Sequence, residues 1–439
     1  MSLRIKKIPL EPNICGAILF VLCILTSNIQ RNMNYANFGV MAVFAYQIYS
    51  SRKVRKNYLG FIWGIYIIIY PLFDAKFRGE VGLSTFDFFC YASPLFALIG
   101  NDFHDKELMI LCRGIKYLAR FQAFGMILSR VWRRLYIIIA WRVLGNWTPT
   151  VMGFSPNQAV VACALSGGYC VVLSEYLFSD RIYYINRVDK LKMLLEIGIY
   201  IYTLVQTTKR FVLIAIVAAT FVLLICKSIN NGKKLIITIA VFAIFIIGAY
   251  YICIGCYQIY GETNAIGRLG ATILGLEQGE DVSNNRSLWA SFMTEWWQEN
   301  KLFGIGWESF KKRILYKGYG NVPNAHNVYK QVLCETGYVG EVVFVGILSF
   351  TFINHIRNLI INVVENRDCY GFCVYSGVAV SLFVIFAVYC GSGNAIYDSF
   401  AYLYLFSSVI LGDGINVYYS NKCRINRYNQ EMEEVLLKV

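Results

Sequence analysis

Polar side chains that could take part in a reaction gather near the end of the one long polar stretch of this chain. The sequence reads Asn324-Ala325-His326-Asn327 there, and Glu335-Thr336-Gly337 follows closely. Histidine ordinarily titrates near neutral pH, so His326 is suited to accept or donate a proton. It is one of only three histidines in the chain. The pattern predicts a reaction site where an apolar chain meets water.

The composition predicts that membrane-spanning helices position this site. Of the 439 residues, 57% are hydrophobic and 15% are charged, whereas soluble domains carry about 25% charged residues. The formal net charge of +14 does not indicate nucleic acid as a partner, because the basic residues form short runs between apolar segments. Such runs are typical of cytoplasmic loops under the positive-inside rule. They lie at 4–7, 52–56, 227–234 and 422–427.

An all-α, polytopic integral membrane protein with about twelve spanning helices is expected, because a helix needs about 20 apolar residues to cross a bilayer. The basic start and first apolar run lack a small-residue cleavage site, which favours a first spanning helix over a signal peptide. The spans are expected at 13–30, 34–50, 58–73, 83–100, 108–128, 157–178, 190–207, 210–227, 235–256, 337–357, 370–390 and 394–412.

This topology divides the chain into four parts. Residues 1–256 form an N-terminal bundle of about nine helices, and residues 257–336 form a large extracytoplasmic loop. Residues 337–412 form the C-terminal spanning helices, and residues 413–439 form a cytoplasmic tail. Both termini then lie in the cytoplasm, since the basic runs fall on that side.

Two charged segments leave their relation to the membrane open. Arg113, Lys116 and Arg120 lie at i, i+3 and i+7 on one face of 108–128. They either line a cavity inside the membrane, where charges are usually functional, or this segment lies at the interface. The same alternative holds for 131–146, which contains Arg142 and tryptophans suited to headgroup depth.

The long loop is expected to form two helices. Arg286, Trp289, Met293 and Trp296 recur at helical spacing, after capping residues at 281–285. Gly304 and Gly306 break that helix. Asn324 is expected to cap the second helix, which Gly337 ends or bends; one face of it would carry His326, Tyr329, Lys330 and Leu333.

Metal and disulfide chemistry is not indicated. The 14 cysteines are scattered and mostly lie inside apolar segments, where buried free thiols are the ordinary finding. Cys253-x-x-Cys256 and Cys369-x-x-x-Cys373 have neither a second pair nor a histidine partner. No paired carboxylates and no glycine-rich phosphate loop occur. We therefore expect no metal and no cofactor.

Five motifs in order resemble the O-antigen polymerase and ligase superfamily, a group of bacterial membrane enzymes that handle polysaccharides on a lipid carrier. The resemblance covers roughly residues 140–412. At the first position of the Ser/Thr-x-Arg pattern, this chain has threonine in place of serine. The motifs are Gly153-Phe154-Ser155-Pro156-Asn157, Thr208-Lys209-Arg210, Arg286-Ser287-Leu288-Trp289, Asn300-Lys301-Leu302-Phe303-Gly304-Ile305-Gly306-Trp307, and Asn324-Ala325-His326-Asn327 with Glu335-Thr336-Gly337.

The resemblance implies a metal-independent membrane glycosyltransferase of GT-C-like class at the outer face of the bacterial inner membrane. Its donor would be a glycan on undecaprenyl pyrophosphate, transferred to an acceptor hydroxyl with inversion. His326 would be the base, and Arg210 and Arg286 would clamp the pyrophosphate, because a guanidinium grips phosphate oxygens bidentately. Further substrate-binding candidates are Arg142, Arg268, Asn324, Asn327, Glu335 and Trp289.

Structural roles compete with several of these assignments. Arg210 could contact lipid headgroups by snorkelling, and Arg286 could pair with Glu295 or Asp281 on the loop surface. Glu335 fits an orienting or structural partner better than a base.

The acceptor separates the function hypotheses. A polymerase adds to another lipid-linked repeat unit of O-antigen or capsular polysaccharide, and proteins of this type usually work with a chain-length regulator. A ligase transfers the polymer to lipid A-core. A glycan-lipid transporter is the hypothesis from another class, but transporters carry internal repeats and broken helices at midplane, and the sequence shows no repeat.

Overall fold

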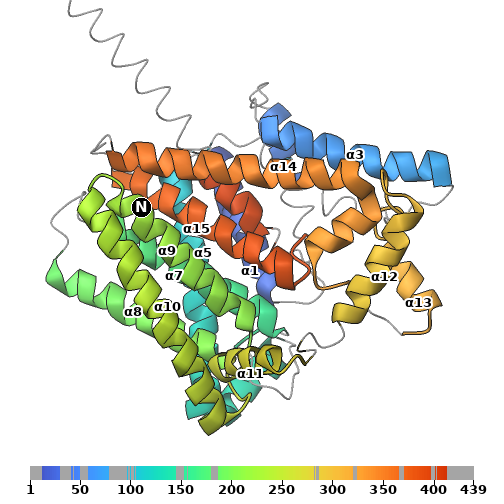
Figure 1. The fold of residues 1–439 in the computed structure, drawn as a ribbon. Coiled ribbons are helices and arrows are strands. Elements are labelled where there is room, and N and C mark those ends of the chain that lie inside the picture. Colours follow the sequence, from blue (N-terminus) through green and yellow to red (C-terminus); the bar gives the residue numbers. More distant parts are fainter. Residues whose placement is uncertain are drawn as a thin grey trace, which may run out of the picture.

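The computed structural model describes most of the chain as helices joined by short turns (Figure 1). The N-terminal helices are α1 (Pro12–Ile29), α3 (Tyr58–Arg78), α5 (Asp105–Val131), α6 (Arg133–Ile137), the π-helix η1 (Ile138–Val143), α7 (Gln158–Phe178) and α8 (Arg187–Gln206). The remaining labelled helices are α9 (Arg210–Ser228), α10 (Gly232–Tyr260), α11 (Ala265–Glu277), α12 (Arg286–Glu299), α13 (Ser309–Tyr316), α14 (Val328–Val364) and α15 (Tyr370–Ser392). The described residues are 12–29, 41–42, 44–49, 58–78, 96, 99, 103, 105–144, 153–155, 157–178, 186–280, 282, 286–319, 324–364, 370–396, 401 and 403–412.

Two helices form the centre of the bundle. In both α7 and α15, 89% of the residues in the apolar stretch are buried, and both helices pack against α9. Close approach is possible because α7 carries Gly167-Gly168: a Cβ on Gly168 would lie 2.1 Å from the Cβ of Ala119 in α5. Small residues at such contacts are typical of helices that pack inside a membrane.

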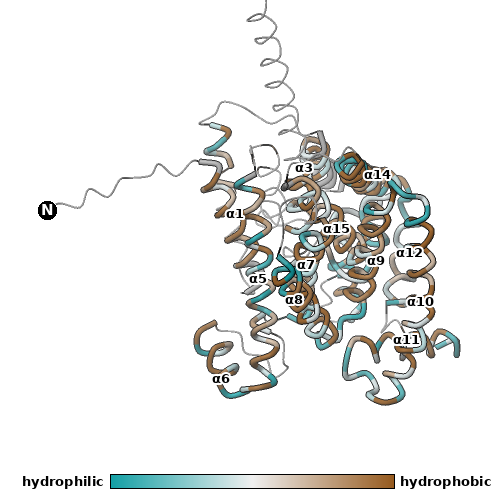
Figure 2. The backbone as a smooth tube through the Cα atoms, turned by 90° about the vertical axis from the view of Figure 1, so that its left-hand side faces the viewer, coloured by the Kyte–Doolittle hydropathy of each residue, from teal (hydrophilic) through white to brown (hydrophobic). Residues whose placement is uncertain are grey.

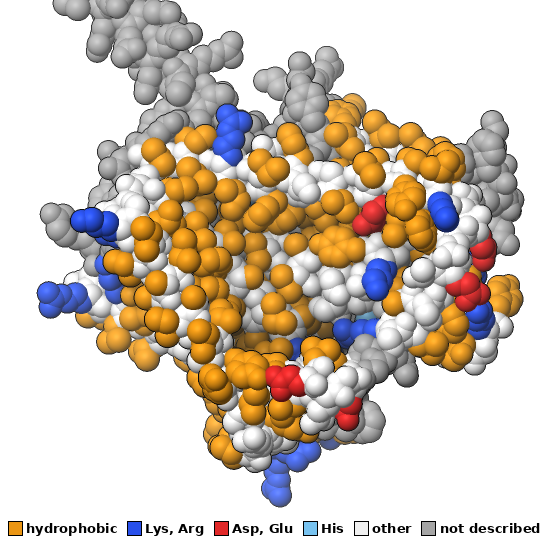
Figure 3. Space-filling model, in the orientation of Figure 1, with side chains coloured by type: hydrophobic (Ala, Val, Ile, Leu, Met, Phe, Trp, Pro, Cys, Tyr) orange, Lys and Arg blue, Asp and Glu red, His pale blue; other side chains and the backbone are white. Residues whose placement is uncertain are grey.

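Helix α10 shows the opposite environment. None of its side chains is buried, although the helix is apolar on every side. An exposed helix of this kind is stable where lipid replaces water as the surrounding medium. Figure 2 shows the apolar stretches running along the bundle. Figure 3 shows that apolar side chains cover most of the face seen in Figure 1.

Five described helices are long and apolar enough to cross a membrane: α7, α9, α10, α14 and α15. They coincide with predicted spans, and the shorter apolar helices Ile14–Thr26, Gly60–Ile69 and Leu403–Gly412 coincide with three more. Helices α5 and α8 match predicted spans in position, but their charged residues keep them outside this group. The predicted span at 83–100 lies almost entirely outside the described residues, so the number twelve stays a prediction.

The predicted outer loop contains more helix than the sequence indicated. Helix α11 was not predicted; it begins at Ala265, where the side chain of Asn264 accepts a hydrogen bond from Gly267 N. Helix α12 runs from Arg286 as expected, whereas the predicted caps at 281 and 283–285 lie outside the described residues. Helix α14 begins in the loop and crosses the predicted boundary at 336/337, bending at Gly337 (φ 67°) as expected.

Candidate functional site

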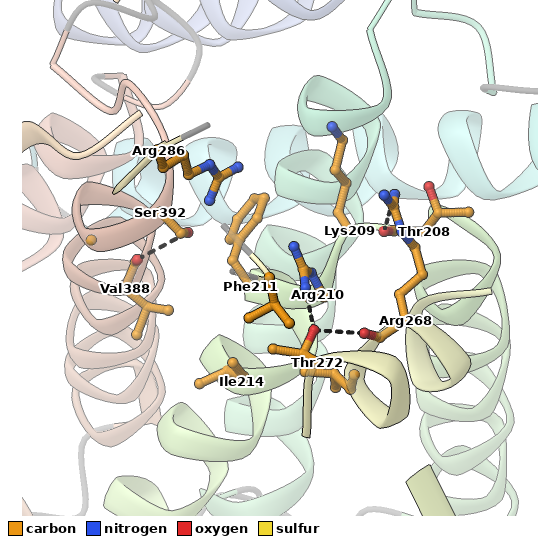
Figure 4. A pocket seen from close by; sticks show the side chains of 13 residues that line it. Thr208, Lys209, Arg210, Phe211, Ile214, Arg268, Thr272, Arg286, Val388 and Ser392 are labelled. Atoms are coloured by element: carbon orange, nitrogen blue, oxygen red, sulfur yellow. Dashed lines mark hydrogen bonds between the residues drawn. The ribbon is translucent and has the colours of Figure 1, made fainter. Parts of the chain in front are cut away.

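A cavity of about 570 Å³ opens where four segments meet (Figure 4). The turn before α9 contributes one wall, α11 a second, the first residue of α12 a third and the end of α15 a fourth. The lining residues are Thr208, Lys209, Arg210, Phe211, Ile214, Arg268, Leu269, Thr272, Val282, Arg286, Val388, Gly391 and Ser392.

The tight turn between α8 and α9 fixes the cationic wall. Helix α8 ends at Gln206, and Thr208 takes a left-handed backbone conformation (φ 57°) that lets α9 restart at Arg210. The hydroxyl of Thr208 donates to Gln158 Oε1 at 3.1 Å, which ties the turn to the start of α7. Positive φ is uncommon for a residue with a Cβ, and such strain tends to occur at functional sites.

Hydrogen bonds to α11 orient the arginines of this wall. Arg210 donates to the hydroxyl of Thr272, which in turn donates to the carbonyl of Arg268 at 2.7 Å. Arg268 donates to the carbonyl of Thr208 at 3.3 Å and lies 3.4 Å from the carboxylate of Glu262. The interlocked contacts hold two guanidinium groups at the cavity from neighbouring helices.

Arg286 faces the same space from the opposite side, and Figure 4 shows it and Arg210 on either side of Phe211. Burial lowers the pKa of Arg286; the nearby positive charge of Arg268 acts in the same direction, and Tyr389 acts in the other. Arginine nevertheless stays charged at neutral pH. Its placement at the first residue of α12 therefore adds a fixed positive charge to the cavity.

The charge balance of the cavity is one-sided. Four of its lining side chains are Lys or Arg, and no Asp or Glu is among the described residues that line it. Figure 3 shows Lys and Arg side chains at a hollow in a face that is covered mainly by apolar side chains. A concave site of one charge concentrates ligands of the opposite charge, so the arrangement favours an anion.

His326 lies beside this cationic cluster. Burial lowers the pKa of its imidazole, and the positive charges of Arg286 and Lys209 lower it further. The ring is therefore neutral at pH 7, the form that accepts a proton. The backbone of His326 is left-handed (φ 56°), and its backbone N–H donates to the side-chain oxygen of Asn394 at 3.0 Å.

The comparison with known families falls on this region. Residues 197–345 match the family model described as O-antigen ligase. The match supports the O-antigen polymerase and ligase superfamily. It runs from α8 through α11, α12 and α13 into α14 and contains every cavity residue except those of α15. No curated protein matches the chain.

The matched O-antigen ligase segment gathers most of the predicted site residues. Arg210, Arg268 and Arg286 line the cavity together, and His326 lies within reach of the charges of Arg286 and Lys209. The alternative partner of Arg286, Glu295, instead lies 3.6 Å from Lys317. Asp281, the other alternative, is outside the described residues.

Three predicted substrate-binding residues lie elsewhere. Trp289 is buried in a small apolar core with Met293 and Trp296, which share the inner face of α12, and with Phe310 of α13. Arg142 is exposed on η1, outside the matched segment; α6, which leads into η1, lies across the molecule from α11 in Figure 2. Glu335 is fully buried, and its carboxylate accepts from Phe310 N at 3.3 Å. This contact lies within the protein, and the role of Glu335 toward a substrate stays a prediction.

The predicted cap of the second loop helix is wrong. Helix α14 begins at Val328, and the side chain of Asn327 accepts a hydrogen bond from Lys330 N at 3.1 Å. Asn324 instead accepts from the side chain of Gln331 at 2.9 Å. Both asparagines suit a cap by residue type, so only the hydrogen bonds that each side chain makes distinguish them. His326 consequently precedes the helix and does not share a face with Tyr329.

The cationic face of α5 does not join the cavity. Lys116 bonds the carboxylate of Glu175 in α7, and Arg120 bonds that of Glu196 in α8, each at 2.7 Å. Arg113 is exposed on the same helix. Two of the three residues thus form ion pairs within the bundle, and none of the three lines the cavity described above.

Sequence reasoning missed Lys209 as a site residue, although it stands in the Thr-Lys-Arg motif, and missed Thr272, Gln331 and Asn394. No local signal marks Asn394, since it reaches His326 from a distant segment. Among the described residues, no group of three His, Cys, Asp or Glu side chains could hold a metal ion. Metal independence stays a prediction.

Proposed function

We propose that the protein is a membrane glycosyltransferase that polymerises oligosaccharide repeat units carried on undecaprenyl pyrophosphate. One observation carries this proposal: four cationic side chains surround a cavity beside a neutral histidine, with no acidic side chain among the described lining residues. A pyrophosphate leaving group needs fixed positive charge, and an acceptor hydroxyl needs a base. The O-antigen ligase match supports the same substrate class.

In the proposed reaction, Arg210 and Arg286 bind the pyrophosphate oxygens of the donor. The acceptor oxygen attacks the anomeric carbon from the face opposite the pyrophosphate, and its proton passes to the free ring nitrogen of His326. The bond between the anomeric carbon and the phosphate oxygen breaks, and undecaprenyl pyrophosphate leaves with the electron pair. One glycosidic bond forms with inversion, and the proton later passes from His326 to solvent.

The electrostatics of the site link binding to catalysis. In the free enzyme, Arg286 and Lys209 disfavour protonation of His326. A bound pyrophosphate brings negative charge that offsets these cations, which raises the affinity of the imidazole for a proton. His326 thus becomes a stronger base once the donor is in place.

The corresponding ligase is the second candidate, because the matching family model is described as O-antigen ligase. In that case the same groups would transfer finished polymer to lipid A-core. For either reaction we propose a multi-pass inner-membrane protein with cytoplasmic termini and the cavity facing outward. A polymerase would in addition work with a chain-length regulator.

Glycan profiling of cells that carry His326→Ala in place of the native copy tests the proposal. We expect the ladder of long glycans to disappear while single repeat units stay attached to the surface lipid. Lys311→Ala, an exposed lysine on α13, is the matched control and should keep the ladder. Polymer accumulating on the carrier lipid would instead identify a ligase, and an unchanged His326→Ala ladder would exclude His326 as the base.

A further inference from the structure

We propose that Gln331 and Asn394 are positioning residues that hold His326 beside the cationic cavity. This inference rests on the proposed function, because it assigns them to the base of that reaction. Neither residue was predicted from the sequence, and neither lines the cavity. Each acts through hydrogen bonds to the turn Asn324-Ala325-His326.

Gln331 fixes the turn from the first part of α14. Its side chain is 1% exposed, and both ends of its amide are engaged. The nitrogen donates to Asn324 Oδ1 at 2.9 Å and to Glu335 Oε1 at 3.1 Å, and the oxygen accepts from Ala325 N at 3.0 Å. A carboxylate on one side and a backbone N–H on the other leave a single orientation for this amide.

Glu335 completes the support beneath Gln331. Its Oε1 also accepts from Phe310 N, and its carbonyl accepts from Gly306 N at 2.8 Å. The chain of bonds therefore runs from the segment after α12, through Glu335 and Gln331, to the residues just before His326. A fully satisfied buried network of this kind makes its members rigid.

Asn394 fixes the turn from the other side. It follows α15, is 7% exposed and accepts the His326 N–H at 3.0 Å. The same helix end supplies Val388, Gly391 and Ser392 to the cavity wall. The end of α15 thus places both the cavity and the backbone of the base in one rigid frame.

The backbone of His326 needs such support. Its left-handed conformation (φ 56°) is disfavoured for a residue with a Cβ, and it persists where surrounding contacts fix it. Loss of either contact would let the turn relax. Displacing a catalytic group by about 1 Å can lower the rate about 100-fold.

The test measures polymer formation by the purified full chain. The probe is the undecaprenyl-pyrophosphate-linked repeat unit extracted from cells that lack the native copy. Gln331→Leu and Asn394→Leu are expected to lower kcat about 10- to 100-fold per folded molecule, with KM changed less than about twofold. A loss confined to the amount of folded protein, with kcat per molecule unchanged, would overturn the proposal.

Asn394→Asp supplies a second variant that is close in shape. The carboxylate keeps an acceptor for the backbone N–H of His326. It also places negative charge near the imidazole, whose other charged neighbours are Arg286 of α12 and Lys209 before α9; Lys330, in the first turn of α14, is exposed. We expect activity to be retained at high pH and the acid limb to move upward by about one pH unit. An unmoved acid limb would contradict the assigned contact, even if both leucine variants fail to accumulate.

Failure of the inference is distinguishable from failure of the proposed function. Full activity of His326→Ala would remove the base and the proposed mechanism together. An inactive His326→Ala with wild-type kcat in the Gln331 and Asn394 variants would remove only the positioning role.

Discussion

Two groups of cationic side chains lie among the helices of this protein, and their partners differ. On α5, Lys116 and Arg120 each bond a carboxylate on a neighbouring helix at 2.7 Å. Around the cavity, Lys209, Arg210 and Arg286 face a space that no described acidic residue lines. The comparison teaches that the presence of cations does not identify an anion site. Cations that carboxylates on neighbouring helices already neutralise are structural, whereas cations around a cavity that no described carboxylate lines are suited to bind an anion.

The largest effect is expected at the cavity. Arg286→Ala should lower polymer formation about 100- to 1000-fold, because one positively charged donor to the leaving group is lost. Arg286→Lys should recover only part of this, since an ammonium cannot grip two oxygens at once. Turnover per molecule in detergent measures both variants. Near wild-type activity of Arg286→Ala would remove the distinction between the two groups.

Removing a paired cation should affect stability instead. Lys116→Met leaves Glu175 without its ion pair in a partly buried position, which we expect to destabilise the fold by about 1 to 3 kcal/mol. Adding Glu175→Gln should restore most of the loss. Thermal unfolding of the single and double variants measures this, while turnover per folded molecule should stay at the wild-type value. A turnover defect that persists in the double variant would place Lys116 in the reaction.

Arg268 is intermediate between the two groups, because it lines the cavity and also pairs with Glu262 at 3.4 Å. Arg268→Ala should lower activity only about tenfold, since part of its charge is already balanced. Glu262→Gln should act in the opposite direction and lower KM about twofold. Steady-state kinetics on both variants test whether the balance of charge sets the affinity; equal losses in both would argue against it.

The smallest effect concerns pH. Burial and nearby cations lower the pKa of His326 in the free enzyme, and the base must be neutral, so activity falls as the pH drops through that pKa. The acid limb of kcat/KM should therefore lie below the ordinary value of about 6.5. The acid limb of kcat should lie at a higher pH, because bound pyrophosphate offsets the cations. Coincident limbs would mean that the donor does not occupy this cavity.

Much of the helical architecture was readable from the sequence. The apolar runs predicted α7, α9, α10 and α15 closely, because a helix satisfies its backbone hydrogen bonds within its own segment. The bend at Gly337 was also predictable, since the chain there needs a positive φ. Helix α11 was missed because Ala265–Glu277 has neither the length of a span nor a charged pattern that sets it apart from a loop.

The site divides in the same way. Sequence alone determined which residue types are available: His326 in a polar motif, and Arg210 and Arg286 at the starts of helices. Only the tertiary structure decided which of them meet. Packing places Arg268 at the cavity, Arg142 on η1 and Trp289 in an apolar core. It also brings Asn394 into hydrogen-bond contact with the backbone of His326. The physical reason is that helix formation depends on neighbours along the chain, whereas charge balance and hydrogen-bond partners depend on groups that packing brings from distant segments.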